Sequence, residues 1–180
     1  STTFQFFEVL PLHTRALFAY LYRRKVNLEI AKQFLQEAHY SFLPRNDGKY
    51  LFALAYANDL GGYELRSKSY KGGTSPKGIT THLGRENAAT VVFEGFMDML
   101  SWVTMTGGVK HNIVVMNSTV NKEATVEALQ SVSGTIYLCL DNDDSGNEAT
   151  AFVQNVLPSA IDYRNHFAGY KDVNEYLMHR

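Results

Sequence analysis

The second half of this chain contains four short apolar runs, each followed by a segment with apolar residues at helical spacing. Such runs are shorter than most helices, and their alternation with helices is typical of parallel strands in a sheet covered on both faces. The predicted strands cover 89–93, 112–116, 135–140 and 160–163, and the predicted helices cover 96–106, 120–131, 146–156 and 173–178.

The first half follows a different pattern. Residues 14–40 have apolar residues at helical spacing, and Asn27 has the position of an N-cap between two helices. Residues 44–48 have the composition of a turn. Residues 50–57 and the run that begins at Tyr63 are strand-like with a Gly-rich turn between them, which predicts a β-hairpin.

The segment between the halves is rich in Gly, Ser, Thr and Lys over residues 67–84, which predicts an exposed, mobile loop. We therefore expect a small α+β subdomain over residues 1–85 and a compact α/β domain over residues 86–180. The expected fold class is α/β, with a parallel sheet sandwiched by helices.

Composition narrows the class of protein. The 180 residues are 45% hydrophobic and 13% aromatic, which suits a folded globular chain. No apolar run approaches the roughly 18 residues of a membrane span, and the first residues have no pattern of a secretion signal. The one cysteine, Cys139, lies in an apolar run and is interpreted as a buried thiol. The cytoplasm is the expected compartment.

Carboxylates follow two of the predicted strands. Glu94 comes directly after the first strand, and Asp141 and Asp143 follow the third. Ligands of open parallel sheets bind beyond the carboxyl ends of the strands, so these side chains are expected to share one crevice. Gly95 and Gly146 are expected to permit tight turns and a close approach of the backbone to a ligand.

Converging carboxylates repel one another unless a cation neutralises them. Oxygen-only ligands favour Mg²⁺ or Mn²⁺, which would stabilise the charge of phosphoryl oxygens. Simpler interpretations remain open at this point, because Asp-x-Asp runs are often turns, Asp144 or Ser145 is suitable as a helix cap, and Asp98 is suitable as a first-turn charge.

The net charge of −1 does not show that acidic residues are concentrated in the motifs, whereas basic residues exceed acidic ones in the rest of the chain. If six carboxylates belong to a metal centre, the remaining surface has 17 basic against 12 acidic residues, which is compatible with phosphate binding. The six are Glu94, Asp98, Asp141, Asp143, Asp144 and Asp172.

These motifs resemble the Toprim domain shared by topoisomerases, primases, recombination-repair proteins and some nucleases. That domain is marked by a Glu after its first strand and an Asp-x-Asp after its third, which Glu94 and Asp141-Asn142-Asp143 match. The fuller strings are similar to the catalytic core of bacterial DNA primases. They are Glu94-Gly95-Phe96-Met97-Asp98, Asp141 to Gly146, Lys171-Asp172-Val173-Asn174-Glu175 and, in the first half, Tyr20-Leu21-Tyr22-Arg23-Arg24 and Gly61 to Arg66.

The resemblance implies a nucleotidyltransferase in which a nucleotide 3′-hydroxyl attacks the α-phosphate of an incoming nucleotide and pyrophosphate leaves. It implies that Glu94 is a metal ligand or the general acid/base. It also implies that four aspartates hold the metals, directly or through water: Asp98, Asp141, Asp143 and Asp172. The implied cofactor is Mg²⁺ or Mn²⁺.

The sequence departs from primases at several points. Asn174 stands where primases usually have a second Asp, so we expect one metal contact to be weakened. The initiator Met, the upstream zinc-binding module and the helicase-interacting tail are not in this sequence. We therefore expect a longer parent protein, similar to primase-like proteins of mobile elements and phages, and a fragment without full priming activity.

Basic residues provide candidate contacts to nucleic acid or nucleotide. Those on or beside the Gly-rich segment are expected either to grip a template or triphosphate, or to be ordinary solvated charges. Lys171 is expected to reach a phosphate or to pair with Asp172. Tyr63 and Tyr70 could stack on bases, but packing or incidental exposure is favoured. Trp102 is interpreted as core, and the six His residues receive no role. The candidates are Arg66, Lys68, Lys71, Lys77 and Lys171.

Three functions are consistent with these motifs. The first is a primase-like nucleotidyltransferase core that acts on a single-stranded DNA template and nucleoside triphosphates. The second is a Toprim nuclease with water as nucleophile, and the third is a non-catalytic nucleic-acid-binding module. A replicative helicase or an upstream zinc-binding module is the expected partner of the longer protein, and no membrane is expected. A topoisomerase is disfavoured because its Tyr nucleophile lies on a large separate domain.

Overall fold

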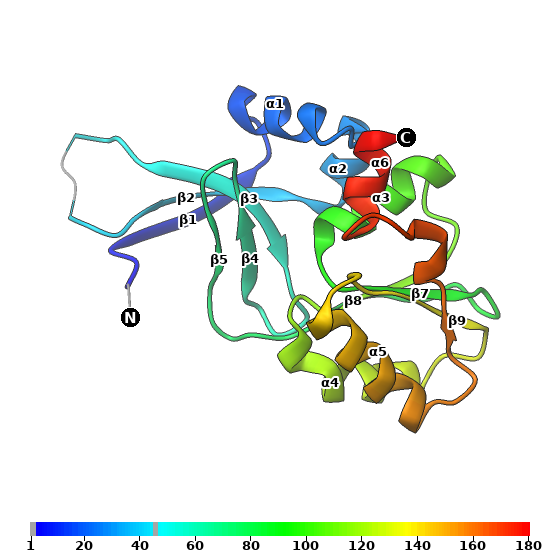
Figure 1. Cartoon of the computed structure of the whole chain (residues 1–180). Helices are drawn as coiled ribbons and strands as arrows, with labels where there is room; N and C mark the ends of the chain where they lie inside the picture. The colour runs from blue at the N-terminus through cyan, green and yellow to red at the C-terminus, as the bar shows by residue number, and fades with distance from the viewer. Residues whose placement is uncertain (1–2, 45–46) are drawn as a thin grey trace.

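The computed structural model describes residues 3–44 and 47–180, and their strands form two five-stranded sheets (Figure 1). Besides two short 3₁₀ turns at Thr119–Asn121 and Arg164–Phe167, the elements run in chain order as follows. They are β1 (Phe6–Pro11), α1 (Arg15–Arg23), α2 (Leu28–Phe34), β2 (Gln36–Ser41), β3 (Leu51–Ala57), β4 (Tyr63–Arg66), β5 (Lys71–Gly73), β6 (Thr80–His82), β7 (Thr90–Phe93), α3 (Phe96–Thr106), β8 (Asn112–Val115), α4 (Lys122–Leu129), β9 (Ile136–Cys139), α5 (Asp144–Val156), β10 (Ile161–Asp162) and α6 (Val173–His179).

The first sheet is antiparallel throughout, with the strand order β1-β2-β3-β4-β5. Its β3–β4 pair confirms the predicted hairpin. The prediction of helix through residue 40 is wrong, because α2 ends at Phe34 and residues 36–41 form β2. β2 gains hydrogen-bonded partners on both sides, β1 and β3, and this pairing overrides the apolar spacing.

The predicted loop between the two halves is also wrong in part. Residues 67–84 contain β5, which completes the first sheet, and β6, which pairs antiparallel with β8 of the second sheet. The predicted turn at 44–48 includes Arg45 and Asn46, which lie outside the described residues. The Asn27 prediction is confirmed, since its side chain accepts a hydrogen bond from the amide of Ile30 at 3.0 Å.

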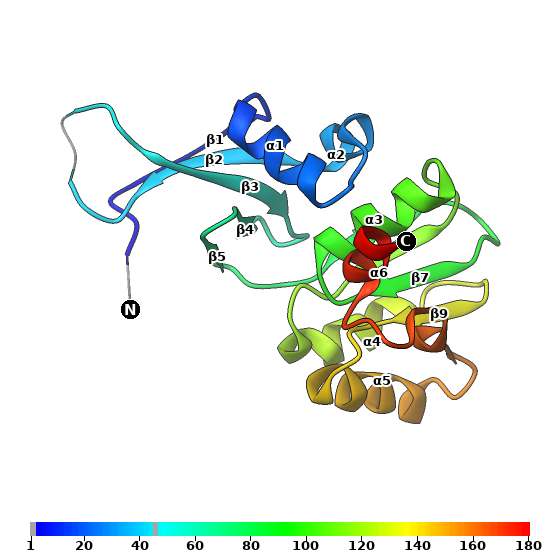
Figure 2. The same cartoon turned by 45° about the horizontal axis from the view of Figure 1, so that its top comes forward.

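The second sheet has the order β10-β9-β7-β8-β6, and its first four strands are parallel. Figure 2 shows α3 and α6 on one face of this sheet and α4 and α5 on the other. Alternate residues of β7 follow this division, because Val91 and Phe93 pack with α3 whereas Val92 packs with α4 and α5. The predicted α/β class is therefore confirmed.

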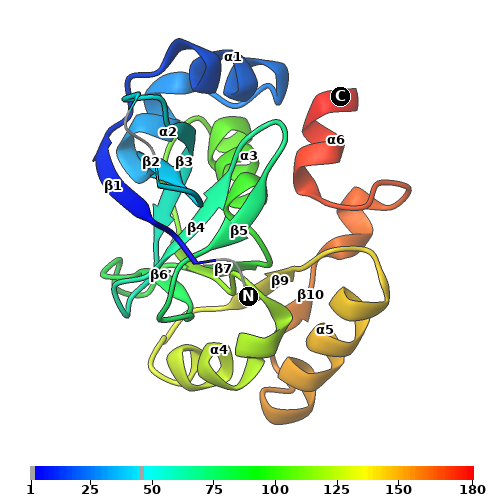
Figure 3. The same ribbon diagram turned by 90° about the vertical axis from the view of Figure 1, so that its left-hand side faces the viewer.

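One core cluster includes residues from both halves of the chain. Leu17 and Leu21 of α1 belong to the same buried cluster as Phe93 and Met99. Figure 3 shows α1 at the opposite end of the molecule from α4 and α5. The division at residue 85 remains a prediction. In the part of the chain that the structure describes, no helix has the length and apolarity to cross a bilayer.

Candidate metal centre

The carboxylates Glu94 and Asp141 emerge at the same edge of the second sheet. β7 and β9 are adjacent and parallel, with Phe93 opposite Cys139, so the residues that follow them lie side by side. The backbone amide of Asp141 donates a hydrogen bond to Oε1 of Glu94 at 3.3 Å. Cys139 itself is buried without a disulfide, as predicted.

Five carboxylates form two overlapping groups around Asp141. One group consists of Glu94, Asp141 and Asp143, and the other of Asp98, Asp141 and Asp172. Within each group, one ligand atom per residue lies within 4.8 Å of the others. The structure therefore brings together five of the six acidic residues selected from the sequence, with Asp141 common to both groups, whereas Asp144 belongs to neither.

Two of these aspartates also begin helices. Asp143 caps α5 by accepting the amide of Gly146 at 2.8 Å, and Asp172 caps α6 by accepting the amide of Glu175 at 2.8 Å. The suggestion that Asp144 or Ser145 caps this helix is wrong, because α5 begins two residues earlier than predicted. Each cap uses one carboxylate oxygen, so the second oxygen remains available for a cation.

The two motif glycines differ in what they permit. A Cβ at Gly146 would lie 1.9 Å from the backbone oxygen of Asp141, so only glycine allows α5 to begin this close to the Asp141 turn. A Cβ at Gly95 would meet only Oδ2 of Asp98, at 4.0 Å. The fold therefore requires Gly146 but not Gly95, and a close approach of Gly95 to a ligand remains a prediction.

Asp98 is the most deeply buried of the five acids, with 6% of its surface exposed. Its Oδ1 accepts the backbone amide of Asn174 at 3.0 Å. Burial raises its pKa well above the ordinary value, and the charges of Asp172 and Asp141 raise it further. Asp98 lies in the first turn of α3, as expected. Because its side chain is buried, a favourable interaction with the helix N-terminus does not by itself explain its position.

The other central carboxylates also resist ionisation. Burial, together with the charges of Glu94, Asp172 and Asp143, raises the pKa of Asp141 to about 7, whereas Lys171 opposes this shift. Burial likewise raises the pKa of Glu94, and the charge of Asp143 adds to this effect. Among residues 3–44 and 47–180, Oδ1 of Asp141 is buried without a hydrogen-bond partner. An unsatisfied carboxylate oxygen among other carboxylates fits an oxygen-liganded divalent cation such as Mg²⁺ or Mn²⁺.

A pocket of about 350 Å³ opens over these acids. Four of the predicted acids line it, namely Glu94, Asp98, Asp141 and Asp172, whereas Asp143 adjoins it through the first carboxylate group. Of the predicted basic residues, Arg66, Lys71 and Lys171 line the pocket.

Two predicted basic residues do not line the pocket, although Lys77 pairs with Glu64, which does. Lys68 is exposed and does not line the pocket, and Nζ of Lys77 lies 3.9 Å from Oε2 of Glu64. The predicted packing of Tyr70 is confirmed, since its ring centroid lies 5.4 Å from that of Tyr40. Trp102 packs against the core as expected, although it is only partly buried.

Several polar residues of the pocket were not selected from the sequence. Arg24 follows α1 and donates a hydrogen bond to Oδ1 of Asn174 at 3.1 Å. In the sequence, Arg24 could have been identified as a site residue from its position in a basic run and in the primase-like string around Tyr20. Glu64 lies in the primase-like string Gly61 to Arg66 and so carried a similar signal, whereas Asn117, Ser118 and Thr119 carried none.

Comparisons with known proteins agree with this geometry. A family model described as Toprim-like matches residues 91–177, and one described as a domain of unknown function (DUF8464) matches residues 6–75. No protein of curated function shows a significant sequence match. The Toprim-like match confirms the resemblance drawn from the acidic motifs.

Solved structures extend the comparison to the whole chain. The primase fragment of the bacteriophage T7 primase-helicase protein superposes with a TM-score of 0.62 at 20% identity, over 93% of this chain and 73% of that one. A complex of the T7 lagging-strand DNA polymerase with primase domains of two gp4 subunits bound to an RNA/DNA hybrid and dTTP gives a TM-score of 0.63 at 21% identity, over 94% and 84%. The Aquifex aeolicus primase, with its zinc-binding and RNA polymerase domains, gives 0.54 at 12% identity, over 82% of this chain and 48% of that one.

The fold and the family match define the class: residues 91–177 form a Toprim-like domain. Over 93% of its length, including the antiparallel sheet in front of that domain, the chain has the fold of the primase fragment of the bacteriophage T7 primase-helicase protein.

Proposed function

We propose that this chain is a metal-dependent, primase-like nucleotidyltransferase core that acts on single-stranded DNA and nucleoside triphosphates. The observation that carries the proposal is the pair of carboxylate groups sharing Asp141 at the floor of a pocket with a basic rim. A phosphoryl-transfer site needs this combination, because cations must neutralise both the carboxylates and the phosphates.

The acidic residues divide into two roles. Asp98, Asp141, Asp143 and Asp172 would hold Mg²⁺ or Mn²⁺, directly or through water. When bound, such ions stabilise the negative charge of phosphoryl oxygens. Glu94 is partly exposed to the pocket and has a raised pKa, which suits either a ligand or a group that exchanges a proton with the attacking 3′-hydroxyl.

The basic residues on the rim would bind the phosphates. Arg66 of β4 and Lys71 of β5 come from the first sheet, whereas Lys171 precedes α6. A triphosphate placed over the acids would thus contact cations from both halves of the chain. Lys68 and Lys77 lie outside the pocket, so we assign them to contacts with a template strand beyond it.

The expected surroundings follow from the same proposal. The proteins of similar fold include a T7 primase-helicase protein and a primase that carries a zinc-binding domain. We propose that a longer parent protein works with a replicative helicase or a zinc-binding module. That parent would be a primase-like protein of a mobile element or phage, and it would act in the cytoplasm.

Two assays separate this function from the alternatives. Formation of oligonucleotides from a single-stranded template, nucleoside triphosphates and Mg²⁺ is the expected activity, in the longer parent protein if not in this chain alone. Strand cleavage without nucleotides would indicate a nuclease instead. Binding of nucleic acid without either activity would indicate a non-catalytic module.

Variants connect the activity to the proposed centre. Glu94→Gln and Asp141→Asn should each lower the rate by at least about 100-fold, as loss of a group acting in the transition state does. Glu123→Gln, which neutralises an exposed carboxylate on α4, is the matched control and should retain the rate. Full activity in both site variants would refute an enzymatic role for the centre.

A further inference from the structure

A second buried carboxylate lies far from the acidic centre in the sequence. Glu37 of β2 has no exposed surface. Its Oε1 accepts the backbone amides of His13 at 2.6 Å and Thr14 at 2.8 Å, and its Oε2 accepts the hydroxyl of Thr14. Glu37 therefore anchors the connection between β1 and α1 to the neighbouring strand.

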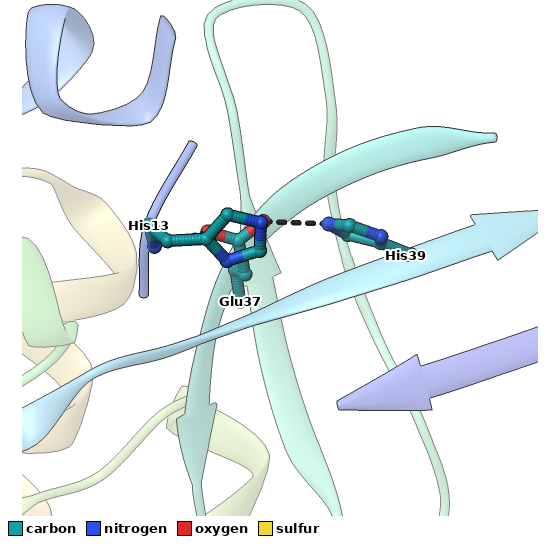
Figure 4. A group of neighbouring side chains, drawn as sticks. All are labelled: His13, Glu37 and His39. Carbon is teal, nitrogen blue, oxygen red and sulfur yellow. Dashed lines mark hydrogen bonds and ion pairs between the residues drawn. The ribbon is translucent and has the colours of Figure 1, made fainter. Parts of the chain in front are cut away.

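Two histidines meet this carboxylate from different elements. His39 lies two residues along β2 and so faces the same side, with Nε2 2.6 Å from Oε2 of Glu37. His13 follows β1, the strand that pairs with β2, and its Nδ1 lies 3.3 Å from Oε1 of Glu37. Figure 4 shows the imidazole rings of His13 and His39 close to the carboxylate of Glu37. One ligand atom from each residue lies within 4.8 Å of the other two.

We propose that His13, Glu37 and His39 form a second metal site, which takes a transition-metal cation of the Zn²⁺ type and is separate from the acidic centre. Two imidazole nitrogens and one carboxylate are a recognised ligand set for Zn²⁺, with a fourth position left for water. Imidazole also selects against Mg²⁺, which prefers oxygen ligands. The two sites would therefore differ in the metal they hold.

The distances need only small adjustments. Two ligands at about 2.05 Å from a tetrahedral Zn²⁺ are roughly 3.3 Å apart, which is the separation of Nδ1 of His13 from Oε1 of Glu37. His39 contacts the other oxygen, Oε2, so the carboxylate would bind the cation through both oxygens. The His39–Glu37 contact would lengthen by about 0.7 Å on the same reasoning. Nδ1 of His13 now bonds the backbone oxygen of Pro11 at 2.9 Å and would exchange this bond for the metal.

Exposure and charge favour binding of a cation here. The side chains of His13 and His39 are 59% and 25% exposed, so solvent reaches the two imidazoles that contact the buried carboxylate. Burial works to raise the pKa of Glu37, but the hydrogen bonds from His13, Thr14 and His39 outweigh it and hold the pKa below its ordinary value. Among the described residues, the ion pairs of Glu37 are with these two histidines and with no Lys or Arg.

A metal at this position would fasten the start of α1 to β2. His13 lies beside the N-cap residue Thr14, and His39 lies within the sheet. Binding to the folded chain alone stabilises it in proportion to the logarithm of the metal concentration. The proposal does not depend on the nucleotidyltransferase function, since none of the three residues lines the acidic pocket.

The test is a titration of the intact chain with Co²⁺ in excess Mg²⁺, followed by displacement with Zn²⁺. Mg²⁺ occupies oxygen-only sites, so the Co²⁺ absorption bands report nitrogen-containing ligand sets. The wild type should bind one equivalent, and Zn²⁺ should raise its free energy of unfolding. His13→Ala and His39→Gln should each weaken binding by more than about tenfold.

The variants are chosen to preserve the fold. Gln at position 39 still offers an amide donor to Glu37, and Glu37 itself is unchanged. His179→Ala, which removes an exposed imidazole on α6, is the control and should bind Co²⁺ as the wild type does. Absence of Co²⁺ binding by the wild type, or unchanged binding in the His13→Ala/His39→Gln double variant, would overturn the proposal.

Discussion

The amide of Asp141 donates to Oε1 of Glu94, and this bond joins the ends of two adjacent parallel strands at the centre of the acidic pocket. The bond favours an ionised Glu94, yet burial keeps the pKa of both carboxyl groups raised. A cation that binds here must therefore displace protons from these groups as the pH falls.

Stabilisation by Mg²⁺ should consequently depend on pH. With its pKa raised to about 7, Asp141 contributes stability that is full below its unfolded value, near 3.8, and is lost as the pH rises towards 7. The metal-free chain should lose stability over this range, and Mg²⁺ should restore more at pH 8 than at pH 6. If binding displaces one proton, the affinity should fall about tenfold per pH unit below 7.

Denaturant unfolding with Mg²⁺ and with EDTA at each pH measures this effect. Asp141→Asn is the comparison, because it removes both the titrating group and the shared ligand. It should show little response to Mg²⁺ at either pH. An equal increment from Mg²⁺ at pH 6 and pH 8 in the wild type would contradict the prediction.

Although the sequence missed β6, a three-residue edge strand, it predicted β7, β8 and β9 of the second sheet well because helices cover these strands on both faces. Continuous apolar runs such as Val91–Phe93 therefore signal strands directly. β1 and β2 are defined instead by each other and by β3, and nothing local separates residues 36–41 from a helix. That error also hid the Glu37–His39 pair, since residues two apart share a face on a strand but not on a helix.

The candidate site, like the fold, could be predicted only in part from the sequence. Glu94 and Asp141 were found because the ends of parallel strands converge wherever such a sheet forms. Arg24 and Glu64 belong to the first half of the chain, and their place at the pocket depends on how that half packs against the second. Local patterns do not encode that packing.

Asn174 is the clearest departure from the primase motif, and the structure gives it a role that Asp cannot fill. Its Nδ2 donates to the backbone oxygen of Arg24 at 3.0 Å and to Oγ of Ser101 at 2.8 Å. Asn174→Asp would lose both donors and add a charge beside buried Asp98. We expect it to lower the free energy of unfolding by about 2–4 kcal/mol in EDTA at pH 8.

Denaturant unfolding of Asn174→Asp checks this value. Asn165→Asp makes the same change at an exposed position and should stay within about 0.5 kcal/mol of the wild type. A stable Asn174→Asp variant with raised Mg²⁺ affinity would show that the chain tolerates the usual primase residue there, against this prediction.

The basic residues should differ in their effect on binding of single-stranded DNA. Arg66 and Lys71 line the pocket, whereas Lys68 is exposed outside it. If both pocket residues contact phosphates, Arg66→Ala and Lys71→Ala should each reduce the slope of log affinity against log salt by about 0.7. Fluorescence anisotropy with a labelled oligonucleotide over a salt series measures the slope. A larger change from Lys68→Ala than from Lys71→Ala would place the nucleic acid elsewhere.

Substitution by Ala should destabilise the chain at Gly146 but not at Gly95. Gly146→Ala would force a Cβ to within 1.9 Å of the backbone oxygen of Asp141, so α5 or the Asp141 turn must move, at a cost of about 1–3 kcal/mol. Gly95→Ala meets no atom closer than 4.0 Å and begins α3 with φ at −131°, so its stability should be nearly unchanged. Denaturant unfolding compares the two variants directly. Equal stability of the two variants would mean that α5 does not approach Asp141 this closely. The contact of α5 with the Asp141 turn would then no longer explain why Asp141 belongs to both carboxylate groups.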